Sequence, residues 1–296
     1  MREKTKASQS FKGAGFDSHA HLNFKAFNND YPKIIKKCLE ENLWLINVGS
    51  KYNTSEKAVD IAEKCEKGVW AAVGLHPIHI EDEVFNYQKY LELAKNPKVA
   101  AIGETGLDYR RITNDELRIK NLQKEVFKKQ IELAMELNKP LIIHCRDAHD
   151  DVVKILDSCF KIHVPRLRGV IHCFTGNSQQ AEQYLELGFL LGFTGIITYS
   201  SDYDAIIKDI PLEKILIETD CPYLTPLKMQ TDADDTQTNA DNLPRQSASS
   251  PRKSAFIRNE PLYVKYVAQK IAEIRGLSLE KTAEQTFRNA LRLFKI

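Results

Sequence analysis

Short apolar runs alternate with longer segments of helical period along most of the chain. Eight of these runs are bounded by turn residues and have the length of buried strands. Such alternation is typical of repeated βα units that form a parallel sheet. Eight units predict a closed (β/α)8 barrel of the TIM type. The runs are Phe16–His21, Leu43–Gly49, Val69–Leu75, Val99–Gly103, Leu141–Cys145, Gly169–Phe174, Phe189–Phe193 and Ile215–Thr219.

The segments between the runs carry apolar residues at three- and four-residue steps. In the longest of them Leu122, Val126, Ile131 and Ala134 fall on one face, and Lys and Glu fill the other. This pattern predicts amphipathic helices that cover the sheet. The predicted helices are Asp30–Glu41, Ser55–Lys67, Glu83–Lys95, Asp115–Leu137, Ala148–Phe160 and Ser178–Leu187, with Pro261–Glu273 and Ser278–Phe294 as additional helices at the C-terminus.

A length of 296 residues suits either one barrel or two ordinary domains. The pattern favours a polar lead over residues 1–15 and a single barrel over residues 16–296. Within the barrel, Leu227–Ser254 is rich in Asp, Thr, Asn, Gln and Ser, so it predicts a mobile loop that cannot offset its ordering entropy by burial. We expect deletion of this loop to leave the stability of the fold nearly unchanged.

Composition narrows the environment of the protein. The N-terminus has no apolar leader, and no run approaches the ~18 apolar residues that span a bilayer. The six cysteines lack C-x-x-C spacing, which is typical of reduced thiols. We therefore expect a cytoplasmic protein without a membrane partner. The net charge of +2 is nearly balanced, so any contact with DNA requires a local patch.

Side chains that bind metal ions follow the predicted strands at their carboxyl ends. His19 and His21 end the first run, and the two-residue period of a strand points them to the same face. The carboxyl ends of all barrel strands meet at one mouth. A lone histidine there is more often structural, but five of the eight histidines fall at these ends, which favours a metal site. The other polar residues at the strand ends are His76, Glu104, His144, Arg146, His172, Glu218 and Asp220.

The motifs DSHAHL, GLHP, GETGLDY, IHCRDA, HCFTG, ETDCPYLTP and RNEP occur in the order found in the TatD family of metal-dependent hydrolases, which this chain resembles from about Phe16 onward. The resemblance implies two divalent cations. It implies that His19, His21 and Asp220 bind one cation, that His144 and His172 bind the other, and that Glu104 bridges both. It also implies a deoxyribonuclease, since some members trim single-stranded DNA from the 3′ end and others are suspected of acting at abasic sites.

Two cations at the mouth would activate a water molecule and offset negative charge on a phosphodiester. In this scheme Glu104 and Asp220 are catalytic, and Asp220 receives a proton or steers the water. His76 and Arg146 are candidates for binding the substrate phosphate. Glu218 either orients a neighbouring ligand or is a structurally paired carboxylate. The donor set accepts zinc, manganese or magnesium, and no protein partner is expected.

Two other readings of the sequence remain open. The same cations would serve an amidohydrolase that cleaves an amide or ester bond of a small molecule or an aminoacyl ester. A nucleic-acid-binding module without catalysis would leave the histidines unexplained. Asn259, Glu260 and Pro261 of the last motif fit an ordinary helix start as well as a role in catalysis. Because clustered carboxylates repel one another, we expect Glu104→Gln to be at least as stable as the parent without metal.

Overall fold

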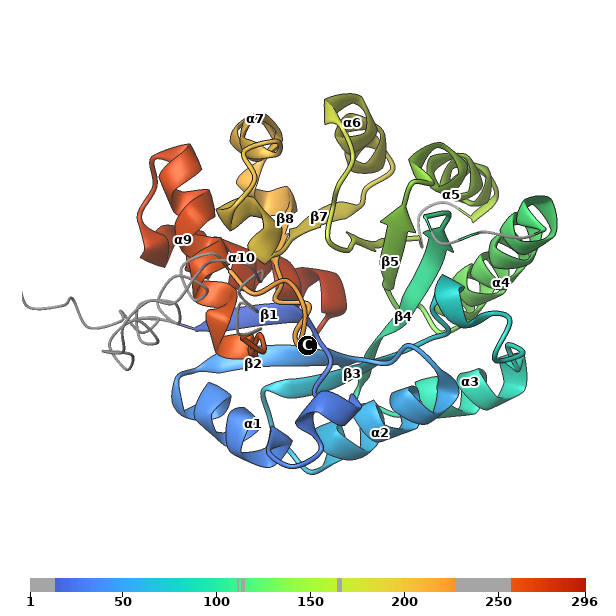
Figure 1. Cartoon of the computed structure of the whole chain (residues 1–296), viewed down its shortest axis with the longest axis horizontal. Helices are drawn as coiled ribbons and strands as arrows, with labels where there is room; N and C mark the ends of the chain where they lie inside the picture. The colour runs from blue at the N-terminus through green and yellow to red at the C-terminus, as the bar shows by residue number, and fades with distance from the viewer. Residues whose placement is uncertain (1–13, 111, 113–114, 164–166, 227–256) are drawn as a thin grey trace, which may run out of the picture.

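The computed structural model of the chain describes residues 14–110, 112, 115–163, 167–226 and 257–296. Eight parallel strands form one sheet in sequential order, with helices on its outer side (Figure 1). An isolated parallel bridge between Ala20 and Cys221 joins the ends of the first and last strands. The predicted (β/α)8 barrel is therefore confirmed. The strands are β1 Gly15–Ala20, β2 Leu43–Val48, β3 Val69–Val73, β4 Val99–Asp108, β5 Leu141–Arg146, β6 Gly169–Ile171, β7 Leu190–Phe193 and β8 Ile215–Ile217.

The helices agree with the periodic segments of the sequence, apart from the short α7, which the pattern did not predict. The α-helices are α1 Tyr31–Glu40, α2 Tyr52–Glu63, α3 Tyr87–Ala94, α4 Glu116–Glu136, α5 His149–His163, α6 Ser178–Glu186, α7 Asp204–Asp209, α9 Val264–Arg275 and α10 Leu279–Phe294. The 3-10 helices are η1 Lys25–Phe27, η2 Pro77–His79, η3 Gly195–Thr198, η4 Leu212–Lys214 and η5 Pro261–Tyr263.

The strands differ from the predicted runs mainly at their carboxyl ends. β4 continues past Gly103 to Asp108 because this extension pairs with β5, Gly106 lying opposite His144 and Asp108 opposite Arg146. β6 instead ends at Ile171, before the predicted Phe174. These shifts matter for function, because the polar residues of the strand ends lie in these stretches.

The opposite end of the barrel is closed by α10, which packs against β1 and β8. The Phe294 ring stacks on Phe16 with 6.2 Å between centroids, and the Phe287 ring lies 5.3 Å from that of Trp44. These rings join the apolar residues that fill the barrel interior. The interior is thus a packed core, and polar chemistry is confined to the carboxyl end.

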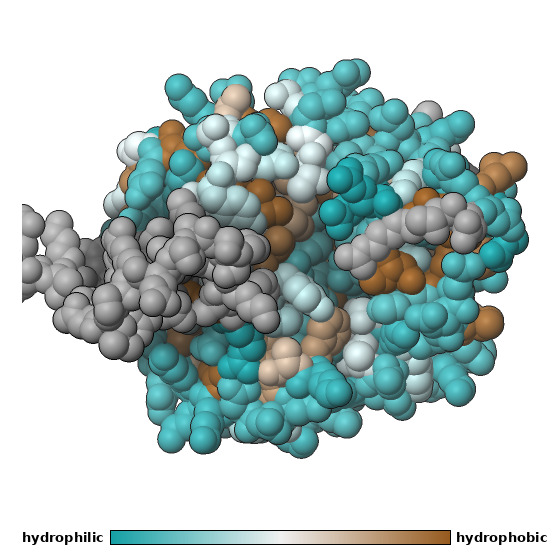
Figure 2. Space-filling model, viewed as in Figure 1, coloured by the Kyte–Doolittle hydropathy of each residue, from teal (hydrophilic) through white to brown (hydrophobic). Residues whose placement is uncertain are grey.

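Hydrophilic residues dominate the face of the molecule shown in Figure 2, and hydrophobic residues appear there in separate patches. Among the described helices, none has the length and apolar character needed to cross a membrane. Most of the predicted polar lead at residues 1–15 and the predicted loop at residues 227–254 lie outside the described residues.

Candidate metal centre

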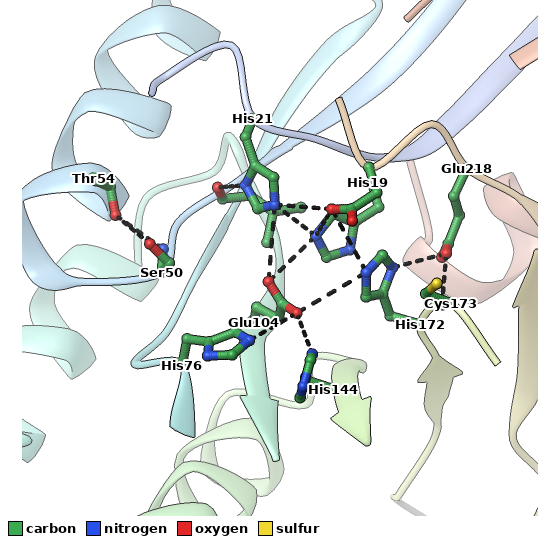
Figure 3. A network of polar contacts seen from close by, with 12 residues as sticks. His19, His21, Ser50, Thr54, His76, Glu104, His144, His172, Cys173 and Glu218 are labelled. Carbon is green, nitrogen blue, oxygen red and sulfur yellow. Dashed lines mark hydrogen bonds and ion pairs between the residues drawn. The ribbon is translucent and has the colours of Figure 1, made fainter. Parts of the chain in front are cut away.

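Five histidines and two carboxylates converge at the carboxyl end of the barrel (Figure 3). They come from six different strands or the loops that directly follow them. Most are buried, and the side chains of His144 and Asp220 are the most exposed, at 18% and 17%. The converging residues are His19, His21, His76, Glu104, His144, His172 and Asp220.

His19, His21 and Asp220 form one group of potential ligands, as the resemblance implies. The two Nε2 atoms lie 3.1 Å apart, and Asp220 Oδ1 lies 3.3 Å from His21 Nε2. His21 Nδ1 donates to the Val48 carbonyl over 2.8 Å, so its Nε2 lone pair points inward. An imidazole lone pair aimed at a second ring nitrogen repels it unless a cation or a proton lies between them. These donors therefore fit a divalent cation.

Glu104 contacts histidines on both of its oxygens. Oε2 lies 3.4 Å from His19 Nε2, whereas Oε1 lies 3.0 Å from His144 Nδ1 and 4.0 Å from His172 Nε2. Each oxygen thus faces a different set of ring nitrogens. This is the arrangement that a carboxylate shared between two cations requires.

Two further carboxylates orient the histidine rings. The fully buried Glu218 accepts from His172 Nδ1 over 2.8 Å, so His172 offers Nε2 to the centre. Asp108 Oδ2 lies 3.0 Å from His144 Nε2, which leaves Nδ1 of His144 for the centre. Fixing the tautomer in this way is the usual role of carboxylates behind metal-binding histidines.

Asp108 belongs to the candidate site through its contact with His144, and the motif analysis gave it no role. The signal was present, since Asp108 lies four positions after Glu104, an even step that places both side chains on one face of a strand. The predicted strand ended at Gly103, however, so this periodicity was not applied to residues beyond it. Glu218 also depends on a glycine that the sequence shows. A Cβ at position 192 would lie 2.3 Å from Glu218 Oε1, so Gly192 leaves the room that this carboxylate occupies.

His76 is held in the opposite way from the other histidines. Its Nδ1 accepts a hydrogen bond from the Ile78 backbone N–H over 3.1 Å, which leaves the proton on Nε2. That nitrogen lies 3.3 Å from Glu104 Oε1. Burial lowers the pKa of His76 to about 4, so the ring is neutral at pH 7. His76 therefore presents an N–H donor to the centre rather than a lone pair.

The charges of the centre are balanced by histidine protons in the metal-free protein. Burial lowers the pKa of His172, but the charge of Glu218 outweighs burial and raises it to about 10. Burial raises the pKa of Glu104, but the surrounding imidazoles together outweigh burial and hold that pKa well below its usual value. The two histidines with a raised pKa, His144 and His172, carry the protons that balance the carboxylates. A divalent cation would displace these protons from the ring nitrogens, so metal binding is expected to weaken at low pH.

The arrangement departs from the implied ligand sets in one respect. His144 and His172 do not share a group, because His172 lies with His19 and Glu104, whereas His144 lies with His76 and Glu104. Arg146 is not brought into the cluster either. It ends β5 and is exposed at the surface.

Comparison with known proteins matches this architecture to one family. Residues 16–295 match the model of the TatD related DNase family. An uncharacterized metal-dependent hydrolase, YabD of Bacillus subtilis, is 36% identical over 95% of this chain and 99% of its own length. The 3′-5′ ssDNA/RNA exonuclease TatD of Erwinia tasmaniensis is 31% identical over 95% of this chain and 100% of its own length. The crystal structure of YJJV, a TatD homologue from Escherichia coli, superposes with a TM-score of 0.75 at 26% identity, over 95% of this chain and 98% of YJJV. The chain therefore belongs to the TatD-related DNase family of metal-dependent hydrolases.

Proposed function

We propose that this protein, an ester-bond hydrolase of the TatD family, cleaves the phosphodiester bonds of single-stranded DNA from the 3′ end with the help of two divalent cations. The observation that carries the proposal is the position of Glu104, whose two oxygens face separate sets of histidines. The TatD exonucleases of Erwinia and Pantoea species, at 31–32% identity, support a nucleic-acid substrate.

One cation would be held by His19, His21 and Asp220. A second would be held by His144 and His172, which lie in separate groups of potential ligands but both face Glu104 Oε1, at 3.0 and 4.0 Å. Glu104 would then be shared between the two cations. Divalent cations at these positions would lower the pKa of a water molecule and offset the negative charge that develops on the phosphate. His21, His144 and His172 are already oriented for this role by Val48, Asp108 and Glu218.

The remaining side chains bind substrate and move protons. Asp220 is the more exposed of the two ligand carboxylates, with 17% of its side chain accessible against 6% for Glu104. It is therefore the group that accepts the proton of the attacking water. His76 Nε2–H donates to a phosphate oxygen, and the neutral ring keeps its proton on Nε2 because Nδ1 accepts the Ile78 N–H. Arg146, exposed at the end of β5, binds a phosphate farther along the DNA strand.

An amidohydrolase that cleaves an amide or ester bond is the competing function, because an activated water attacks a carbonyl as well as a phosphate. β4 carries Glu104 at the candidate bridging position and has no lysine, whereas a modified lysine bridges the cations in dihydroorotase-like barrels. This difference favours the nuclease.

The two functions separate in one assay. The metal-free protein is mixed with a 3′-labelled single-stranded oligonucleotide, a 5′-labelled copy, and a panel of amide, carboxylic ester and aminoacyl ester substrates. Mn²⁺, Mg²⁺ or Zn²⁺ is then added, and Asp220→Asn is the control for contaminating nucleases. We expect early release of the 3′ label and successive shortening of the 5′-labelled copy only with metal. Faster cleavage of an amide or ester than of DNA, or equal cleavage by Asp220→Asn, would refute the proposal.

A further inference from the structure

The residues Arg258, Asn259 and Glu260, which we call the clasp, lie between the two loops that carry the first group of ligands. One loop follows β1 and His21, and the other follows β8 and contains Asp220. The clasp belongs to the RNEP motif, and it precedes η5, as the helix-start reading required. Its contacts, however, extend well beyond the start of a helix.

Asn259 holds the loop after β8. Its side chain is fully buried, and Nδ2 donates to the carbonyls of Thr219 and Tyr223 over 2.8 and 2.6 Å. Its backbone N–H donates to the carbonyl of Pro222. These carbonyls flank Asp220, whose φ of 54° lies in the left-handed region that a residue with a side chain adopts at a cost. Asn259 therefore stabilises the backbone shape that aims Asp220 at the centre.

Arg258 holds the connection after β1. Its guanidinium pairs with both carboxylate oxygens of Asp30, at 3.0 and 2.5 Å, and donates to the carbonyl of Ala26 over 2.8 Å. It also lies 4.4 Å from the centre of the buried Phe27 ring. The bidentate pair and the ring contact fix the position of η1 against the clasp.

The η1 segment is in turn linked to a ligand. Phe24, the residue before η1, stacks on the imidazole of His21 with 4.2 Å between centroids and 11° between planes. Contacts thus run from Arg258 through η1 and Phe24 to His21, and from Asn259 directly to the backbone on both sides of Asp220. Both chains of contacts lead to the same ligand group.

We propose that the clasp is a positioning device that sets the spacing of His21 and Asp220, and so controls the affinity of the site formed by His19, His21 and Asp220. The inference rests on the proposed metal centre. His144 and His172 are oriented by Asp108 and Glu218 instead. Loss of the clasp should therefore weaken one of two cation sites and spare the other.

The chain offers a matched control at the other end of β8, in Asn289 of α10. Asn289 is also fully buried, and its Nδ2 donates to the carbonyls of Leu212 and Ile215 over 2.8 Å each, at the amino end of β8. Asn259→Leu and Asn289→Leu each keep the branched shape of the side chain and remove two buried bonds to main-chain carbonyls. The two variants should lose a similar free energy of unfolding. Only Asn259, however, contacts the backbone beside a proposed metal ligand, Asp220. Arg258→Gln, at a partly exposed position, tests the second branch of the clasp if Asn259→Leu does not fold.

The experiment is a Mn²⁺ titration of each full-length protein at a temperature where circular dichroism shows that every variant is folded. Calorimetry and electron paramagnetic resonance measure the binding. We expect two binding steps in the parent and in Asn289→Leu. In Asn259→Leu, and to a smaller extent in Arg258→Gln, one step should weaken by about 10-fold while the other is unchanged. Parental affinity in folded Asn259→Leu, or an equal loss in Asn289→Leu, would overturn the positioning role. A parent that binds no Mn²⁺ would refute the metal centre itself, and the inference with it.

Discussion

In His21, His76, His144 and His172, the ring nitrogen that points away from the centre makes a hydrogen bond. That hydrogen bond decides what the other ring nitrogen offers to the centre. An acceptor behind the ring, such as the Val48 carbonyl behind His21 or Glu218 behind His172, holds the outer N–H and directs the other ring nitrogen to the centre. A donor behind the ring, such as the Ile78 N–H behind His76, has the reverse effect. At the scale of single residues, these hydrogen bonds distinguish His76, which we propose binds substrate, from the proposed metal ligands.

The role of His76 can be tested by separating metal content from rate. His76→Ala removes an N–H donor but no lone pair directed at a cation, so the number of Mn²⁺ ions bound per chain should be unchanged. Cleavage of a single-stranded oligonucleotide should fall by about 10²-fold, the loss typical of one aligned donor. Metal analysis and initial rates on one preparation measure both effects. A parallel loss of bound metal would show that His76 is a ligand after all.

Glu104 should behave differently, because it faces both sets of histidines. Glu104→Gln is expected to lower metal content and to reduce oligonucleotide cleavage by at least ~10²-fold in Mn²⁺ or Mg²⁺. Parental cleavage by this variant would exclude a bridging role. His76→Ala is the matched comparison, since it alters another neighbour of the same cluster.

The structure reverses our expectation about the metal-free stability of Glu104→Gln. The close neighbours of Glu104 are imidazoles rather than carboxylates, and together they lower its pKa. A carboxylate whose folded pKa is depressed stabilises the fold above its unfolded pKa, and this contribution is lost as the pH falls through the folded pKa. We now expect metal-free Glu104→Gln to be less stable than the parent at pH 7 by urea unfolding. Equal or greater stability would restore the repulsion argument.

At the scale of elements, the sequence predicted which strands carry the chemistry but not where each strand ends. The apolar run of β4 stops at Gly103, yet pairing with β5 extends the strand to Asp108. Hydrogen bonds between neighbouring strands set this extension, and a single-sequence pattern contains no record of them. The same limit hid Asp108. The contacts of the clasp could not be predicted for a related reason. Arg258 contacts a segment more than 200 residues away and Asn259 one about 40 residues away, and only the tertiary fold brings these segments together.

The segment over residues 227–256 can be tested by excision. Thr225 Oγ1 donates to the Ile257 carbonyl over 2.6 Å, so the two ends of the excised stretch already meet. Replacing it with a six-residue Gly/Ser linker shortens the closed loop about fivefold, which should raise the free energy of unfolding by at most about 1.4 kcal/mol. Urea unfolding of both proteins measures the change. A decrease of more than about 2 kcal/mol would show that the segment contributes packing to the barrel.

The turn between α4 and β5 contains a pH-sensitive element. Lys139 Nζ donates to the carbonyls of Asn96 and Val99, next to the start of β4. Burial lowers the pKa of Lys139 from 10.5 to about 8. Below pH 8 the folded and unfolded states both carry the proton, and the cost of burying the charge is fully present. Between pH 8 and 10.5 the unfolded state binds more protons, so stability rises with pH.

Replacement of Lys139 isolates its part of this rise. Because the side chain is partly exposed, solvent screening limits the contribution to about 1 kcal/mol. Between pH 7.5 and pH 10, the free energy of unfolding in urea should therefore rise by about 1 kcal/mol less in Lys139→Met than in the parent. Identical pH profiles for the two proteins would place the Lys139 pKa near its ordinary value.

At the scale of the whole molecule, the proposed ligands tie together strands around the entire barrel. His19 comes from β1, Glu104 from β4, His144 from β5, and His172 and Asp220 from the segments that follow β6 and β8. Cations held by these residues would bind the folded state alone, because the unfolded chain has no preformed site. Metal binding should therefore stabilise the complete barrel rather than one loop.

The size of this effect follows from mass action. A cation present at 100 times its Kd adds about 2.7 kcal/mol to the free energy of unfolding. At about 2 °C per kcal/mol, the low end for a large domain, Tm should rise by about 5 °C when Mn²⁺ is added to the metal-free protein. Chelation should return Tm to its starting value, and a monovalent salt at the same ionic strength should leave it unchanged. In Glu104→Gln the rise should be much smaller, since both cation sites lose a shared ligand. An equal rise in Glu104→Gln would mean that Mn²⁺ stabilises the barrel through a different set of residues.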